Sequence, residues 1–127
     1  MSSAVDRLFV VIGALLGATG VGAGAFAAHA LKPRLGADML AVFDTGAKYQ
    51  LWHALAIIAV GLAWARWPSS ALVSAGWLFV AGTALFSGSL YVVSTTGIRI
   101  FGIVTPFGGV ALILGWLALA WGVSVRR

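Results

Sequence analysis

The chain has 127 residues, of which 61% are hydrophobic and 9% are charged, and its formal net charge is +5. Soluble domains are about one quarter charged, so this composition excludes an ordinary soluble globular protein. The sequence contains no cysteine, which excludes disulfides, thiolate metal ligands and cysteine nucleophiles. Its basic residues are scattered and do not form the clustered face that nucleic-acid binding requires.

The charged residues divide the sequence into four long uncharged segments. Runs of 24, 17, 32 and 26 uncharged residues follow Arg7, Lys48, Arg66 and Arg99 in turn. A membrane-spanning helix needs roughly 17–25 apolar residues, so each run has room for one span and none has room for two. The predicted fold class is therefore an all-α membrane protein, with four transmembrane helices in an up-down bundle that forms one domain over residues 1–127.

The first predicted helix covers about residues 8–31 and is expected to be retained rather than cleaved as a signal peptide. It ends before Lys32-Pro33, because proline disfavours helix at the residue that precedes it. A short amphipathic helix in the membrane interface is predicted over about residues 37–47, where apolar residues recur at helical spacing. Further transmembrane helices are predicted over about residues 49–65 and 71–95.

The last transmembrane helix is predicted over about residues 100–123, and its start has two interpretations. Thr105 as N-cap with Pro106 at the first helical position would begin a helix there, which would leave 100–104 as an interfacial lead-in. Alternatively, Pro106 kinks a longer span, which membrane helices tolerate.

The distribution of basic residues predicts the orientation in the membrane. Four spans place the two termini and the 66–70 turn on one side, with four basic residues on each side of the membrane, which is a tie under the positive-inside rule. The side of the termini has fewer acidic residues, so we predict that it is cytoplasmic; its basic residues are Arg7, Arg66, Arg126 and Arg127. The basic residues expected to face lipid headgroups on the other side are Lys32, Arg34, Lys48 and Arg99.

Polar side chains are predicted to gather in the leaflet that faces away from the termini. Helical spacing gives each segment a common polar face, and up-down connectivity brings those faces to the same depth. The members of this predicted polar cup are His29, Tyr49, Gln50, His53, Ser87, Tyr91 and Thr105. The cup has two interpretations: hydrogen-bonded packing between helices, or a site for an anionic lipid headgroup or another amphiphile.

The two histidines, His29 and His53, leave a metal or haem site as an alternative, because imidazole binds zinc, copper and haem iron. Both lie near the predicted interface, and no cysteine assists them. Ser87 has no acidic partner that could orient a histidine base, so a hydrolase is not indicated. We therefore expect no catalytic residue, no metal and no cofactor.

Small residues form a stripe along the first predicted helix, where the spacing of four and three places them on one face. The stripe consists of Gly13, Gly17, Gly20 and Gly24. Small residues allow helices to approach closely in membranes. The stripe predicts close packing, either within the chain or between copies in a homo-oligomer.

Five phrases, in order along the chain, carry a resemblance to a known family. They are GAFAAHALK at 24–32, FDTGAKYQLWHALA at 43–56, LFSGSLY at 85–91, TPFGG at 105–109 and GW at 115–116. The sequence resembles the uncharacterised YgdD/YwdK-type inner-membrane proteins, domain of unknown function 423, whose relatives include transmembrane protein 256. Ala27 departs from the glycine expected in the first phrase. The resemblance implies a four-helix protein of a bacterial inner membrane and implies no activity.

These observations favour a small, non-enzymatic, multi-pass inner-membrane protein that acts as a lipid-interacting or accessory structural subunit. The expected partners are membrane lipids, further copies of the chain and another membrane protein, with no nucleic acid. One alternative is a small oligomeric transporter or channel, although no ionisable group is predicted at the midplane. The other alternative is a bis-histidine haem or metal protein.

Overall fold

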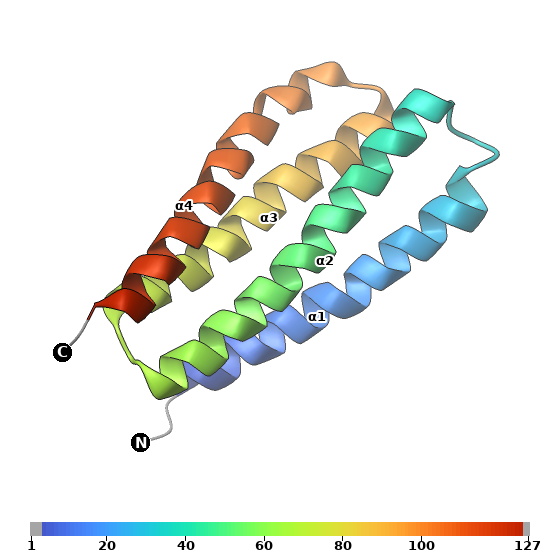
Figure 1. The fold of residues 1–127 in the computed structure, drawn as a ribbon. Coiled ribbons are helices and arrows are strands. Elements are labelled where there is room, and N and C mark those ends of the chain that lie inside the picture. Colours follow the sequence, from blue (N-terminus) through green and yellow to red (C-terminus); the bar gives the residue numbers. More distant parts are fainter. Residues whose placement is uncertain (1–3, 126–127) are drawn as a thin grey trace.

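The computed structural model describes residues 4–125, and it consists of four long helices joined by short connections (Figure 1). No β-strand occurs in this part of the chain. Helix α1 begins, and helix α4 ends, at the same end of the molecule. The long helices are α1 (Ala4–Phe26), α2 (Ala37–Arg66), α3 (Ser70–Thr96) and α4 (Thr105–Ser124). The short elements are a π-helical turn, η1 (Ala27–Leu31), and a 3₁₀ turn, η2 (Arg99–Ile103).

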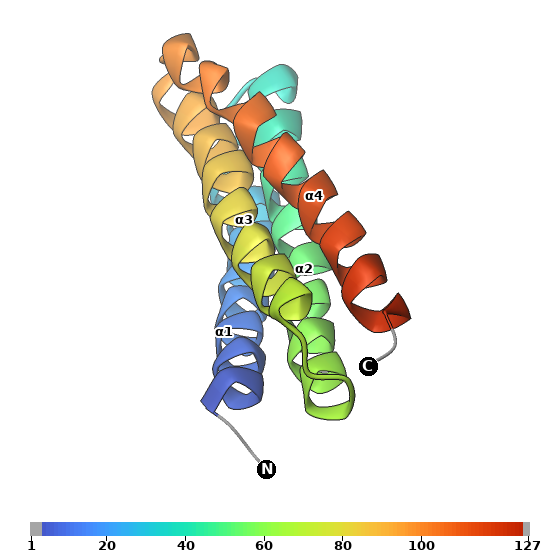
Figure 2. The ribbon, with the colours of Figure 1, turned by 90° about the vertical axis from the view of Figure 1, so that its left-hand side faces the viewer.

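The long helices are arranged side by side in chain order. Helix α1 packs along α2, α2 along α3, and α3 along α4. Helices α1 and α4 lie on opposite flanks of the molecule, as both views show (Figures 1 and 2). The two flanking helices therefore expose wide apolar faces, whereas α3 is the most enclosed of the apolar helices.

The core lies where α1, α2 and α3 meet. Phe9, Ile57 and Phe79 are fully buried there. The ring of Phe9 crosses from α1 to lie against Gly76 of α3, and it makes an edge-to-face contact with Trp77 at 5.3 Å between ring centroids. A side chain at position 76 would occupy the space of the Phe9 ring, so glycine at this position allows the contact between α1 and α3.

The glycine stripe of α1 packs within the chain at two of its four positions. A Cβ atom added to Gly13 would lie 2.7 Å from the carbonyl oxygen of Ala54, and one added to Gly20 would lie 2.9 Å from a methyl group of Leu51. Gly17 has an ordinary contact with α2, and Gly24 has open space around its Cα. Gly13 and Gly20 therefore pack α1 closely on α2, and the association of copies through the stripe stays a prediction.

The separate interfacial helix predicted over 37–47 does not occur, because α2 is one continuous helix of 30 residues. The sequence between the two predicted helices contains no proline, so nothing removes a backbone donor there. Phe43 and Ala47 are buried, which means that the first part of α2 packs against the rest of the molecule instead of lying apart from it.

The other helix boundaries differ from prediction in smaller ways. Helix α1 starts at Ala4, before the predicted residue 8, and its helical path ends as a π turn at Leu31. Helix α3 exceeds the predicted 71–95 by one residue at each end. Ser69 caps it by accepting a hydrogen bond from the Leu72 amide, and Gly97 ends it at φ 74°.

The start of α4 follows the first of the two interpretations. Residues 99–103 form the short η2 turn, and the α-helix begins at Thr105 with Pro106 in its first turn. Thr105 is not the N-cap, however, because Val104 occupies that position. Its hydroxyl pairs instead with the hydroxyl of Ser89 on α3.

Three helical segments are long and apolar enough to cross a membrane, within the described part of the chain. They are Ala4–Leu31, Ser70–Thr96 and Arg99–Ser124. Helix α2 is long enough by its number of residues, but its first half carries Asp38, Asp44 and Lys48. The structure therefore establishes a helical protein with several apolar spans.

Candidate functional site

Gln50 is the central residue of the buried polar contacts. Its side chain is 6% exposed and lies between α1 and α3. The amide nitrogen donates to the Leu16 carbonyl at 2.9 Å and to the Thr19 hydroxyl at 2.7 Å, both on α1. Its amide oxygen accepts a hydrogen bond of 2.6 Å from the Tyr91 hydroxyl on α3. One side chain of α2 thus joins three helices.

Serine residues of α3 provide two further contacts between helices. The Ser87 hydroxyl is buried and donates to the Gly46 carbonyl of α2 at 2.7 Å. The Tyr91 ring packs against the bare Cα of Gly46, so the two helices are close at this level. Ser89 pairs with Thr105 and joins α3 to the start of α4. Each of these bonds satisfies a polar group that would be costly to leave unpaired in a membrane.

His53 has a hydrogen-bond partner at each ring nitrogen. Its Nδ1–H donates to the Tyr49 carbonyl at 2.7 Å, since a carbonyl can only accept. Its Nε2 accepts from the indole N–H of Trp116 on α4 at 3.0 Å, since an indole can only donate. The two bonds define the neutral Nδ1–H tautomer and leave neither nitrogen available to a metal.

The structure does not bring His29 into the polar cup. His29 is exposed in the η1 turn, next to a groove whose lining includes Ala28 and Leu40. His53 follows Leu40 by 13 residues, which is roughly 20 Å along an α-helix. The two histidines therefore lie too far apart to share a metal or haem iron, and no group of three or more His, Asp or Glu side chains suited to a metal occurs in residues 4–125.

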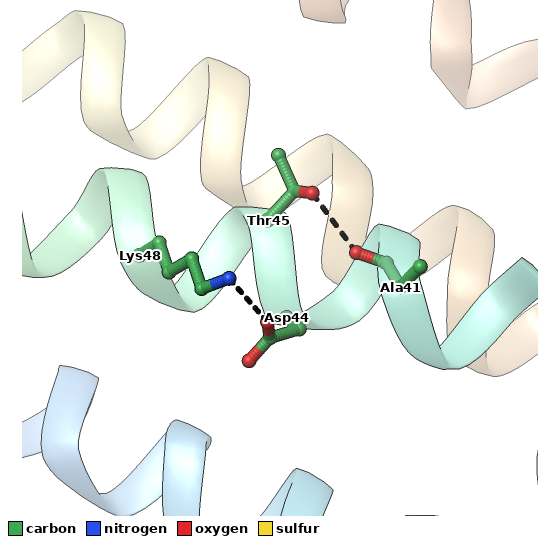
Figure 3. Close-up of polar contacts among 4 residues, drawn as sticks. All are labelled: Ala41, Asp44, Thr45 and Lys48. Carbon is green, nitrogen blue, oxygen red and sulfur yellow. Dashed lines mark hydrogen bonds and ion pairs between the residues drawn. The ribbon is translucent and has the colours of Figure 1, made fainter. Parts of the chain in front are cut away.

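The basic residues expected to face headgroups lie at the end of the molecule opposite the termini or along α2. Lys32 and Arg34 are exposed in the connection before α2, and Arg99 is exposed in η2. Lys48 lies on α2 and forms an exposed ion pair with Asp44, 3.0 Å from Nζ to Oδ2 (Figure 3). Beside it, the Thr45 hydroxyl donates to the Ala41 carbonyl of the preceding turn. The predicted Arg126 and Arg127 lie outside the described residues.

Thr83 differs from the other buried polar residues. Its side chain is 3% exposed, and it lies one turn before Ser87 on the face that α3 presents to the polar contacts. Among the residues that the structure describes, its hydroxyl is the buried side-chain polar atom without a hydrogen-bond partner. An unpaired hydroxyl in an apolar interior costs about 1–3 kcal/mol, so this position lowers stability.

A groove of about 520 Å³ lies between α2 and α4. Aromatic rings form much of its wall: Tyr49 lies 4.5 Å from Phe86 and 5.0 Å from Trp52 between ring centroids. Trp52 and Trp116 are each about half exposed, so the groove is open on the outer side of the helices. Its lining residues are Tyr49, Trp52, His53, Phe86, Gly109, Leu112, Ile113 and Trp116.

The predicted cup residues are thus divided among separate contacts. Gln50, Ser87 and Tyr91 lie between α1, α2 and α3, whereas Tyr49 and His53 face the groove toward α4. Several partners of these residues were not among the predicted site residues; they include Thr19, Gly46, Ser89 and Trp116. The one available signal was the GW phrase at 115–116, which contains Trp116.

The chain is similar to one family of proteins along most of its length. A family model described as "Protein of unknown function (DUF423)" matches residues 23–109. The UPF0382 membrane protein SSP2132 of Staphylococcus saprophyticus is 42% identical over 116 residues, which are 91% of this chain and 96% of that protein. The UPF0382 membrane protein YwdK of Bacillus subtilis is 42% identical over 114 residues, 89% of this chain and 93% of YwdK.

A third relative is aligned over a similar share of its length. The UPF0382 inner membrane protein YgdD of Escherichia coli K12 is 36% identical over 123 residues, which are 96% of this chain and 94% of YgdD. No solved structure matches the chain. The relatives' names describe membrane proteins and assign no reaction.

Proposed function

From the premise that the chain belongs to the DUF423 family of membrane proteins, we propose that it is a non-enzymatic inner-membrane protein with four spans. In this proposal it acts as a lipid-interacting accessory or structural subunit and associates with further copies or with another membrane protein. Both termini face the cytoplasm.

The observation that carries this proposal is that buried polar side chains form hydrogen bonds between the helices. Gln50, Ser87 and Tyr91 hydrogen-bond to neighbouring helices, and both ring nitrogens of His53 are occupied. Within residues 4–125, the buried polar set contains no Asp, Glu, Lys or Arg. Such contacts hold membrane helices together, which is the requirement of a scaffold, whereas transport pathways and proton relays use ionisable groups inside the membrane.

The exposed faces support the interaction with lipids or other membrane proteins. Large apolar side chains cover the outer faces of α1 and α4, among them Leu15, Val21, Ile113 and Leu117, each more than 60% exposed. A water-soluble protein rarely exposes such large apolar surfaces. Hydrocarbon chains or an apolar helix of a neighbour would cover these faces.

The number of spans and the orientation are tested by cysteine labelling, for which the natural absence of cysteine provides a clean background. Three exposed positions in or directly beside successive connections are replaced one at a time, as Gly36→Cys, Ser70→Cys at the first residue of α3, and Ile98→Cys. In intact cells, we expect a membrane-impermeant maleimide to label residues 36 and 98, and to label residue 70 only after the membrane is permeabilised.

The labelling pattern separates the competing topologies. If only α1, α3 and α4 cross the membrane, residues 36 and 70 will be labelled from the same side and residue 98 from the other. Labelling of residue 70 alone in intact cells would retain four spans and invert the orientation. Expression of each variant is checked with a membrane-permeant maleimide.

The accessory role is tested by measuring retained lipid and solute flux on the same preparation. We expect native mass spectrometry from a mild detergent to show assemblies of several chains that carry phospholipid. In proteoliposomes, we expect ion and solute flux no greater than in protein-free liposomes. A flux that disappears in His53→Ala would instead identify a transporter, because His53 is the buried titratable group nearest to the groove.

A further inference from the structure

The groove between α2 and α4 combines three features that together point to one chemical class of ligand. It is walled by aromatic rings, it contains no charged residue among its lining side chains, and it opens on the outer side of the helices. In the four-span arrangement proposed here, that side faces the membrane. A ligand would therefore enter from the lipid phase and not from water.

The aromatic walls favour a flat ring over a flexible chain. The rings of Tyr49 and Phe86 contact each other in the groove wall, and Trp116 of α4 also lines the groove, where it contacts the His53 ring at 5.7 Å between centroids. Aromatic rings prefer offset-stacked or edge-to-face neighbours, and such pairs contribute beyond the apolar area that they bury. A planar conjugated ring can make these contacts, whereas an acyl chain cannot.

The hydrogen-bonding atoms of the groove determine which polar group a bound ligand must have. The nitrogens of His53 and the indole N–H of Trp116 are already hydrogen-bonded. Among the residues that the structure describes, the Tyr49 hydroxyl has no hydrogen-bond partner, and it belongs to a half-buried side chain of the groove wall. The Trp52 indole N–H, at the open side of the groove, has no hydrogen-bond partner among the described residues either. The groove thus offers a phenolic and an indole donor, and both require an acceptor on the ligand.

The charge of the groove excludes an ionic headgroup as its occupant. Lys48, which precedes Tyr49, is turned along α2 to its ion pair with Asp44. A phosphate inside the groove would have no cation beside it, and an unpaired charge in such a place is costly. A neutral carbonyl oxygen accepts from a hydroxyl or an indole N–H without this cost.

We propose that the groove between α2 and α4 binds a membrane quinone, with its ring between Tyr49, Phe86 and Trp116 and one ring carbonyl accepting a hydrogen bond from the Tyr49 hydroxyl. The hydrocarbon tail leaves the groove through its open side past Trp52 and Ile113. This inference rests on the proposed four-span arrangement, which places that side in the lipid.

The test uses the full chain in lipid nanodiscs, titrated with a benzoquinone that carries a ten-carbon tail. Quinones quench nearby indole fluorescence, and two of the six tryptophans, Trp52 and Trp116, line the groove. We expect saturable quenching at one quinone per chain. Tyr49→Phe, which keeps the ring and removes the donor, weakens binding by about 2- to 10-fold, as expected for one hydrogen bond.

A second variant fills the groove without disturbing the helix contact. A Cβ atom at Gly109 would lie 3.7 Å from the Phe86 ring, an ordinary contact, so the backbone accepts a side chain at this position. We expect Gly109→Leu to abolish saturable quenching. The matched control is Gly88→Leu on α3, where no atom lies within 4 Å of the added Cβ, and its quenching curve stays as in the wild type.

Several results would overturn the proposal. Linear quenching that is equal in all variants would mean partition into the bilayer only, and saturable quenching unaffected by Tyr49→Phe and Gly109→Leu would place the quinone elsewhere. Equal competition by decanol would show that the groove takes a hydrocarbon chain. Efficient disulfide formation between two copies of Ile113→Cys would identify a second copy as the occupant. In each case the cysteine-labelling pattern still reports separately on the four spans.

Discussion

Replacing Gly108 with alanine destabilises the protein by about 1–3 kcal/mol, the usual cost of overpacking a close contact. A Cβ atom at this position on α4 would lie 2.8 Å from the Cα and 2.9 Å from the Cβ of Phe86 on α3. Because the nearest atoms belong to the backbone of Phe86, no change of rotamer can relieve the collision. Helices α3 and α4 would have to move apart where Gly108 meets Phe86.

The matched control for this change is Gly88→Ala in the interior of α3. Nothing within 4 Å would meet the new methyl group, and alanine is favoured over glycine in a helix by about 0.5–1 kcal/mol. Unfolding of the purified protein by increasing amounts of a denaturing detergent measures both variants on one scale. Equal stability of Gly108→Ala and Gly88→Ala would contradict the close approach of α3 and α4.

The loss of the Gln50 side chain has the second largest expected effect. Gln50→Leu keeps a similar volume and removes the hydrogen bonds to Leu16, Thr19 and Tyr91. Hydrogen bonds between membrane helices average about 0.6 kcal/mol each, so the three together predict a loss of about 2 kcal/mol. Detergent-induced unfolding again provides the measurement.

A double-mutant cycle isolates the bond between α2 and α3. Tyr91→Phe removes one of the three bonds, so its effect should be about one third that of Gln50→Leu, and the two changes should be less than additive when combined. The control is Thr95→Val, whose hydroxyl bonds only within α3 to the Tyr91 carbonyl and is exposed. Strict additivity of Gln50→Leu and Tyr91→Phe would show that the two side chains do not interact.

Much of the fold follows from local properties of the sequence. The spacing of the charged residues predicts four helical segments, since uncharged runs of sufficient length can satisfy their backbone only as helices in a membrane. Proline and glycine mark the connections, with Pro33 after η1, Pro106 at the start of α4 and Gly97 at the end of α3. These signals act over a few residues, and so they can be read without knowledge of the neighbours.

The continuity of α2 was not predicted, because the charges of its first half indicated an interfacial segment. Asp44 and Lys48 neutralise each other one turn apart, while Phe43 and Ala47 are buried on another face. From its polarity alone, this segment is predicted to be a helix separate from the rest of α2. Its apolar face is buried against other helices, and this packing, which the local sequence does not reveal, accounts for one continuous helix.

The partners of the polar side chains are even less predictable from the sequence than the continuity of α2. Periodicity placed Gln50 and Tyr91 on polar faces, but it could not identify Thr19 as a partner 31 residues away or Trp116 as a partner of His53 63 residues away. The same is true of Gly13, whose role in packing α1 on α2 became clear only from the position of Ala54. Helical periodicity specifies the direction of a side chain around its own axis, whereas its partner depends on the register and rotation of the helix that packs against it.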